Sequence, residues 1–196
     1  MKNKLSIILP MAIVIAFIAN SCNDSNNYLP KPRGYFRIDL PEKAYTRIDT
    51  IERYSFEYPE YALITPDPYS PEEKNWVNIE MPLFKGSIHL THKPVNDNLG
   101  VYLEDVHTMI TKHLQKANGV RDSLIVNDKN QVYGLFIEMD GKGVATPMQF
   151  YLTDSTKNFV RGALYFNFKP DNDSMQPVIN FIRQDIDHMI NTFEWK

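Results

Sequence analysis

Residues 159–168 read FVRGALYFNF, and this stretch decides the fold class. Successive side chains of a β-strand point to opposite faces of a sheet. Val160 and Leu164 share one face of the stretch, and Phe159 and Ala163 share the other. Apolar residues on both faces are typical of a central strand that is covered on each side. We therefore expect a sheet with a packed layer against both of its faces.

The segments around this strand predict an α+β fold. Apolar residues recur every three or four positions from Leu99 to Ala117, which indicates an amphipathic helix. A second helix is expected after Asp173 and Ser174, with Pro177 in its first turn. Further strands are expected at 54–58, 61–65, 76–81, 87–93, 132–139 and 147–153. The result is a mainly antiparallel sheet with two principal helices packed on it, an order that resembles the PsbP-like sandwich in architecture alone.

The first 22 residues have the form of an export signal that ends in a lipid-modified cysteine. Lys2 and Lys4 precede an apolar run from Leu5 to Ala19, which is 15 residues long. A membrane-spanning helix needs about 20 apolar residues, so the run fits the apolar region of a signal peptide better. Cys22 is the only cysteine and stands at the expected cleavage position. This looks like a bacterial lipoprotein signal, the alternative being an incidental thiol after an uncleaved anchor.

Three parts are expected along the chain. Residues 1–21 form the signal peptide, residues 22–34 the lipidated cysteine and a flexible tether, and residues 35–196 a single globular domain. Removal of the two signal lysines leaves 19 basic and 24 acidic side chains, a charge of −5. The charges are spread evenly along the chain, so the sequence gives no basic patch that would predict a nucleic-acid partner. A single cysteine excludes an internal disulfide. We expect a lipid-anchored envelope protein facing the periplasm, with the choice of membrane left open.

Two metal-like motifs are interpreted as surface features. Glu104 and His107 form one carboxylate–histidine pair a helical turn apart, and Asp185 and His188 form another. Such motifs build dinuclear sites in four-helix bundles, but only two helices are predicted here. Both pairs are expected on the polar sides of their helices. We therefore expect no metal, no cofactor and no catalytic residue.

Arg161 is the polar residue that stands out in the central strand. It falls on the face that carries Phe159, and a buried arginine needs a carboxylate or several carbonyls as partners. A turn centred on Thr156 would place Tyr151 opposite Arg161, and Asp154 is the nearest acid in sequence. The first interpretation is a structural ion pair that fixes the hairpin. The alternative is a binding role.

Several segments together resemble the gliding-motility lipoprotein GldD family of the Bacteroidota. These segments are PKPRGYFRI at 30–38, WVNI at 76–79, QFYLTDS at 149–155, FVRGALYF at 159–166 and FEWK at 193–196. The resemblance implies a place in the envelope machinery for gliding, which overlaps with type IX protein secretion. It implies an accessory or assembly role without enzymatic activity, and it gives a defined chemical role to Cys22 alone.

The preferred hypothesis is a non-catalytic lipoprotein that is held in the membrane by its lipid and docks on other gliding and secretion proteins of the envelope. The alternative is a periplasmic module that binds a glycan or another ligand, motivated by the aromatic residues Tyr69, Trp76 and Tyr102. A third hypothesis, a hydrolase, needs a nucleophile and a base that converge in a cleft.

Overall fold

The computed structural model describes residues 34, 37–169 and 171–196. The expected signal peptide, Cys22 and almost all of the tether lie outside these residues. The compact unit spans Tyr35–Lys196. No helix among the described residues has the length and apolar character needed to cross a membrane.

Seven antiparallel strands form the main sheet, in the order β3-β4-β5-β9-β8-β7-β6. Their bounds are β3 Leu63–Pro66, β4 Val77–Met81, β5 Gly86–Pro94, β6 Gly119–Asn127, β7 Val132–Asp140, β8 Met148–Thr153 and β9 Asn158–Phe166. Most of the apolar stretch at 159–168 forms β9, which occupies the middle of the sheet as predicted. Tyr151 lies opposite Arg161 in the β8–β9 pairing, also as predicted.

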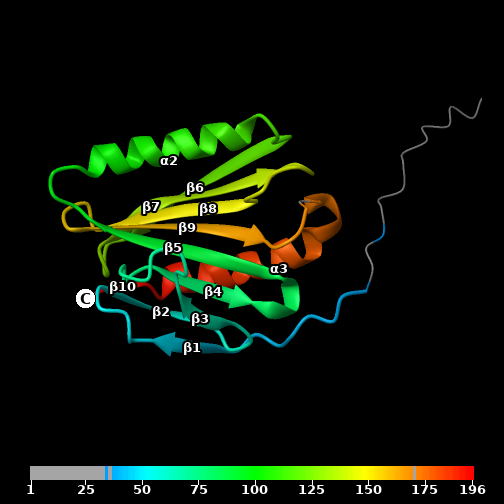
Figure 1. The fold of residues 1–196 in the computed structure, drawn as a ribbon, viewed down its shortest axis with the longest axis horizontal. Coiled ribbons are helices and arrows are strands. Elements are labelled where there is room, and N and C mark those ends of the chain that lie inside the picture. The colour runs from blue at the N-terminus through cyan, green and yellow to red at the C-terminus, as the bar shows by residue number, and fades with distance from the viewer. Residues whose placement is uncertain (1–33, 35–36, 170) are drawn as a thin grey trace, which may run out of the picture. The chain divides into compact units, whose positions relative to one another are not determined.

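The sheet is covered on both faces (Figure 1). Helix α2, Leu99–Leu114, lies on one side, and helix α3, Asn172–Asn191, lies on the other. A small second sheet joins α3 on its side, in the order β1-β2-β10. Its strands are β1 Tyr45–Ile48, β2 Tyr54–Pro59 and β10 Glu194–Trp195. The α+β class and the two helices on antiparallel sheets are as predicted, and the short helix η1, Pro82–Phe84, lies in the β4–β5 hairpin.

The main core lies between the sheet and α3. Every fourth residue returns to the same face of a helix. On α3 this face carries Val178, Ile182 and Ile186, which are almost completely buried against the sheet. Phe150 packs within this core, and Gly162 on β9 makes room for its ring. A Cβ atom at Gly162 would lie 2.0 Å from the Phe150 ring carbon Cζ, so no larger residue fits there.

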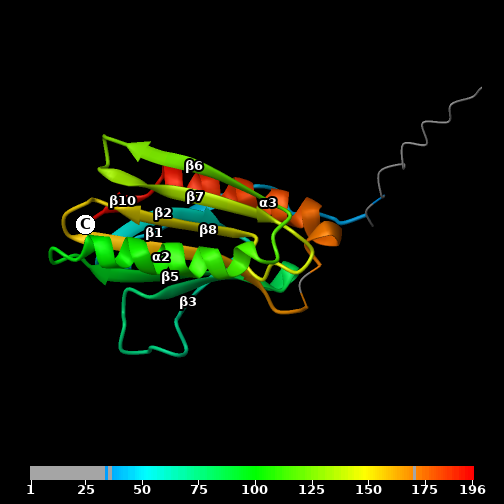
Figure 2. The same ribbon diagram turned by 90° about the horizontal axis from the view of Figure 1, so that it is seen from above.

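The face toward α2 is packed less completely. Val106 is the one fully buried residue of α2, and it joins Val95 and Phe159 in a small cluster. A second small cluster at the other end of the helix contains Ile137 and Val144. Figure 2 shows α2 over the middle strands of the sheet, with β6 beyond the area that the helix covers. A cavity therefore remains between helix and sheet.

Three strands were not predicted. β1 and β10 are short and depend on pairing with β2, which lies in a different sheet from the next strand, β3. β6 carries mixed polar and apolar residues on both faces and is largely exposed. Its nine residues all pair with β7, so the backbone rather than a buried side-chain pattern defines it.

Candidate functional site

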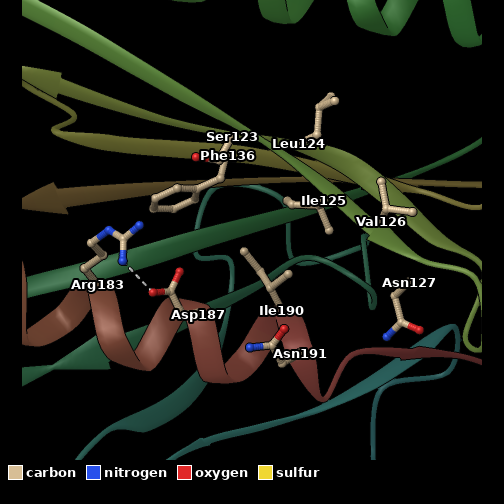
Figure 3. Close-up of a pocket in the computed structure, with 10 residues that line it drawn as sticks. All are labelled: Ser123, Leu124, Ile125, Val126, Asn127, Phe136, Arg183, Asp187, Ile190 and Asn191. Atoms are coloured by element: carbon tan, nitrogen blue, oxygen red, sulfur yellow. Dashed lines mark hydrogen bonds and ion pairs between the residues drawn. The ribbon is translucent and has the colours of Figure 1, made fainter.

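An open groove lies between edge strand β6 and helix α3 (Figure 3). We call it the β6–α3 groove. Its volume is about 330 Å³, and it is lined by residues 123–127 of β6, Phe136 of β7 and a row from α3. The α3 row consists of Arg183, Asp187, Ile190 and Asn191.

The floor of the groove is apolar, and its charges are paired. Phe136 and Ile190 are 3% and 7% exposed, and Figure 3 shows Ile125 and Ile190 pointing toward each other. Arg183 Nε donates to Glu138 Oε1 at 2.9 Å, and its Nη1 donates to Asp187 Oδ2 at 2.7 Å. One cation thus faces two carboxylates at the partly exposed wall of the groove.

These surroundings change the pKa of the Asp187 carboxyl. Burial raises the pKa of the Asp187 carboxyl, the Arg183 guanidinium opposes that change, and the Glu138 carboxylate adds to it. Because the Arg183 cation is already paired, the groove favours an uncharged occupant over an acidic one.

β6 exposes its outer edge and several apolar side chains. It is the last strand in the order of the main sheet, so one of its edges pairs with no strand in the described part of the chain. Leu124 and Val126 are 81% and 66% exposed, and Figure 3 shows both pointing away from α3. The sequence interpretation missed this surface. One sequence signal could have predicted an exposed strand here: Val120, Leu124 and Val126 stand an even number of positions apart in a segment without proline.

A second site lies on the opposite face, beneath α2, and we call it the α2 cavity. Its volume is about 180 Å³. Its walls include Trp76, Tyr102, Met109 and Phe159, and Arg161 lines it from β9. The structure thus brings together two of the residues predicted from sequence, Trp76 and Arg161, together with Tyr102. Tyr69, the third aromatic of the ligand-binding alternative, is 88% exposed and does not line this cavity.

Arg161 has no carboxylate partner among the described residues, so the expected ion pair with Asp154 is wrong. One Nη2 hydrogen bond reaches Gln149 Oε1 at 2.6 Å, and Gln149 Nε2 in turn donates to Thr146 Oγ1 at 2.8 Å. The Nε atom of Arg161 is buried and has no hydrogen-bond partner in the part of the chain that the structure describes. Among the described residues, a neutral amide is therefore the only hydrogen-bond partner of this cation.

Asp154 closes the β8–β9 turn instead. Its Oδ1 accepts backbone N–H groups of Thr156, Lys157 and Asn158 at 2.7–2.9 Å, and its Oδ2 accepts the Asn158 amide. Burial alone would raise the pKa of the Asp154 carboxyl, but these hydrogen bonds together hold it below its usual value. Four donors of the turn thus hold the Asp154 carboxylate in place, and its hydrogen bonds stay within the turn instead of reaching Arg161.

Trp76 and Tyr102 use their polar groups to hold their rings in place. Trp76 Nε1 donates to the His92 carbonyl at 2.6 Å, and Tyr102 OH donates to the Pro94 carbonyl at 3.1 Å. Tyr102 also packs on Phe159, with ring centroids 5.4 Å apart. The aromatic walls of the α2 cavity are therefore fixed before any ligand arrives.

The two metal-like motifs have different surroundings. Glu104 and His107 are exposed, as predicted. Asp185 was predicted on a solvated surface, and this is wrong because the side chain is buried at 2% exposure. Lys43 Nζ lies 2.6 Å from its Oδ1, and the hydroxyls of Tyr45 and Tyr61 also donate to its carboxylate.

Two partners of Asp185, Lys43 and Tyr45, lie just before and at the start of β1, and the third, Tyr61, follows β2. Burial lowers the pKa of the Lys43 ammonium, and its contact with Asp185 opposes that change. His188, the second residue of the motif, bonds to Glu57 Oε2 at 2.6 Å and stacks on Tyr45 at 3.7 Å between centroids. The cluster is a structural link between β1, β2 and α3. Across residues 37–169 and 171–196, no group of three or more potential ligands is arranged to hold a metal ion.

One serine–histidine contact bears on the hydrolase hypothesis. His89 Nε2 lies 2.8 Å from Ser87 Oγ on β5. Ser87 is only 2% exposed, and neither residue lines the groove or the α2 cavity. No described carboxylate bonds to the His89 ring to orient it. The pair therefore lacks the access and the third group that nucleophilic catalysis needs.

The described domain is an α+β sandwich of a covered antiparallel sheet, with an exposed edge strand. A family model described as gliding motility lipoprotein GldD matches residues 25–195, and the chain belongs to that family. The comparison with curated proteins gives no match. Among solved structures, the chain is similar to the solution structure of cyanobacterial PsbP (CyanoP) from Synechocystis sp. PCC 6803, at 13% identity. The match covers 82% of this chain and 98% of that one, with a TM-score of 0.42.

Proposed function

We propose that this chain is a non-catalytic, lipid-anchored component of the gliding-motility and type IX secretion machinery of the envelope. In this proposal Cys22 carries the lipid, residues 22–34 form the tether, and the globular domain faces the periplasm and docks on other envelope subunits. Family membership supports the link to gliding and the lipoprotein class. Two or three acyl chains give lasting attachment, whereas a single chain binds a membrane only marginally.

The observation that carries the docking role is the open edge of β6. Natural sheets usually block an edge with a short strand, a proline or charged side chains, because free backbone groups otherwise pair with another chain. The opposite edge, β3, is blocked in this way, since it has four residues and ends at Pro66. β6 has nine residues and contains no proline. Its charged residues, Arg121 and Asp122, lie in its first half, and its second half exposes Leu124 and Val126.

We commit to an extended segment of a partner envelope protein as the occupant of this edge. A segment added to β6 gains affinity from backbone hydrogen bonds and specificity from pockets for alternate side chains. One set of its side chains would cover Leu124 and Val126, and the other set would enter the β6–α3 groove above Ile125 and Ile190. The paired charges of Arg183 favour neutral or apolar side chains in that groove.

A double variant tests the edge directly. Leu124→Lys with Val126→Lys places two charges on the exposed edge, where lysine blocks strand addition. We expect loss of partner recovery from solubilised membranes and loss of spreading, with unchanged thermal stability, because both side chains are mainly in water. The matched control is Leu83→Lys with Val101→Lys, which changes two apolar residues of similar exposure, 62% and 61%, away from β6.

The comparison of the β6 double variant with its control decides whether a partner docks along β6. If the β6 double variant recovers the same envelope subunits and spreads as well as the control, the edge is not the docking site. A deletion strain scored for both spreading and secreted-protein levels tests the wider proposal, since a normal secreted fraction would remove the link to secretion.

The anchor is tested separately with Cys22→Ala. We expect the variant protein to move to the soluble fraction and to fail in complementation, because the domain is no longer held beside its partners. Intact-mass analysis of the native protein should show a mature chain that begins at an acylated Cys22. An unmodified thiol, or full activity of the variant from the soluble fraction, would contradict the anchor.

A further inference from the structure

The α2 cavity holds a positive charge that the described protein does not neutralise. An arginine side chain has five N–H donors, and Arg161 uses one of them, toward the neutral amide of Gln149. Its Nε is buried without a partner among the residues that the structure describes. A buried donor without a partner is costly, so such atoms usually have a functional explanation. Arg161 also lines the cavity, so an anionic ligand there would supply the counter-charge that the described residues do not.

The other charges at the cavity do not supply that acceptor. Lys93 lies at the rim, where its Nζ is 3.9 Å from Asp105 Oδ2 and 4.8 Å from the centroid of the Tyr102 ring. This rim pair is neutral in sum and leaves Arg161 unmatched. Burial lowers the pKa of His113 on α2, and the nearby Arg161 and Lys116 lower it further, as expected for a region with excess positive charge.

We propose that the α2 cavity binds a small apolar carboxylate, with the carboxylate on Arg161 and the apolar part between Trp76, Tyr102 and Phe159. A guanidinium matches the geometry of a carboxylate and can bond to both of its oxygens. The aromatic walls supply the apolar contact. This site lies on the opposite face of the sheet from the β6–α3 groove, so it does not depend on docking along β6.

Size and wall chemistry decide the ligand class. Sites for drug-sized ligands have volumes of about 300–1,000 Å³, and this cavity has about 180 Å³, so only a small molecule fits. A sugar needs several hydrogen-bond partners. The polar groups of Trp76 and Tyr102 are already bonded to the backbone, and their rings present mainly carbon to the cavity. The walls therefore favour one anionic head with an apolar body over a glycan.

The experiment measures binding of phenylacetate to the full mature chain in detergent, by titration calorimetry and ligand-observed NMR. Phenylacetamide has nearly the same shape without the charge, and inorganic phosphate is an anion without the apolar body. We expect phenylacetate to bind at least about tenfold more tightly than phenylacetamide, as expected when a charge-assisted hydrogen bond is lost. We expect phosphate not to compete.

Variants tie the binding to Arg161. Arg161→Met keeps the length of the side chain without its charge, and we expect it to weaken phenylacetate at least about tenfold while leaving phenylacetamide unchanged. Lys93→Met is the matched control and should change affinity less than about threefold, because exposed, paired charges contribute little. If Arg161→Met fails to fold, Met109→Trp fills the cavity from α2 and should abolish binding of both compounds.

Three results would overturn the proposal. The first is no binding of phenylacetate to the wild-type chain at millimolar concentration. The second is equal affinity for phenylacetate and phenylacetamide, which would make Arg161 irrelevant. The third is competition by phosphate as strong as by phenylacetate, which would define a general anion site without a role for the aromatic walls.

Discussion

The two faces of the main sheet are packed very differently. Toward α3 and the small sheet, 25 buried apolar residues form one continuous cluster. Toward α2, two separate clusters hold three buried residues each. α3 buries nine of its residues, whereas α2 buries Val106 alone. The α3 face therefore supplies most of the stability, and the α2 face keeps space and an unmatched charge that a stability argument does not explain.

The largest expected effect comes from truncating matched phenylalanines on the two faces. Phe193 and Phe159 are 1% and 3% exposed. Phe193→Ala should lower the free energy of unfolding by about 3–5 kcal/mol, as for other large core truncations. Phe159→Ala should cost at least about 1 kcal/mol less, because Phe159 already borders a cavity and loses fewer contacts. Urea denaturation of both variants measures the difference, and equal costs would contradict the asymmetry.

A smaller effect is expected at the buried carboxylate of α3. Asp185→Ala leaves Lys43 without its partner. Removing one member of a fully buried pair costs about 3–5 kcal/mol, but the Lys43 side chain is 23% exposed and can regain water, so we expect about 2 kcal/mol. The control is Asp187→Ala on the same helix. Its side chain is 40% exposed, so the loss should stay below about 1 kcal/mol.

Chemical denaturation compares these two aspartates under the same conditions. Similar losses for Asp185→Ala and Asp187→Ala would show that the cluster around Asp185 does not hold β1 and β2 against α3. Limited proteolysis gives a second measurement. In Asp185→Ala the segment before β1 should be cleaved first, because Lys43 no longer holds that segment against α3.

Asp185 also shows where sequence interpretation reaches its limit. It was predicted on the polar side of its helix, although it stands three residues after Ile182 and four before Met189, which both belong to the apolar stripe. Its charge argued against burial. The partners that permit burial come from Lys43 and Tyr61, more than 120 positions earlier in the chain. Spacing along one helix contains no information about partners that another element supplies.

Strand register explains which part of the α2 cavity was predictable. The sequence predicted Tyr151 opposite Arg161, because a tight turn fixes the register of a hairpin. The meeting of Trp76 with Arg161 needs two further pairings, β4 with β5 and β5 with β9, in which Thr91 lies opposite Arg161. The second of these joins strands about 70 residues apart in sequence, and no local pattern sets their order. The central strand was therefore predictable, whereas the cavity was not.

A pH-dependent effect is expected to separate the two faces further. Burial is the main cause that lowers the pKa of His92, and the nearby Arg53 lowers it further, against the hydrogen bond with Asn158. The unfolded chain takes up this proton near pH 6.5. The folded chain resists protonation until the pH is lower. The contribution of neutral His92 is therefore fully present above about pH 6.5 and is lost progressively as the pH falls from there toward the lower pKa of the folded state.

Thermal unfolding between about pH 7.5 and 5.5 measures this contribution. His92→Gln should lose less stability on acidification than the wild-type chain. His113 on α2 has a pKa lowered in the same direction but is only partly buried, so His113→Gln should flatten the profile less. An unchanged profile in His92→Gln would show that another group dominates acid unfolding.

The smallest expected effect on stability concerns the two arginines that line the two sites. Arg183 is paired with Glu138 and Asp187. Arg183→Met removes both of these partly exposed pairs, although Arg121 stays 3.7 Å from Glu138, and should cost about 1 kcal/mol. Arg161 has no carboxylate partner among the described residues. Arg161→Met removes an uncompensated charge and should change the free energy of unfolding by less than about 0.5 kcal/mol or increase it. Calorimetric unfolding of both variants without ligand measures this contrast. If Arg161→Met destabilised the chain as much as Arg183→Met, its interactions would be structural, and the reason to look for a ligand in the α2 cavity would disappear.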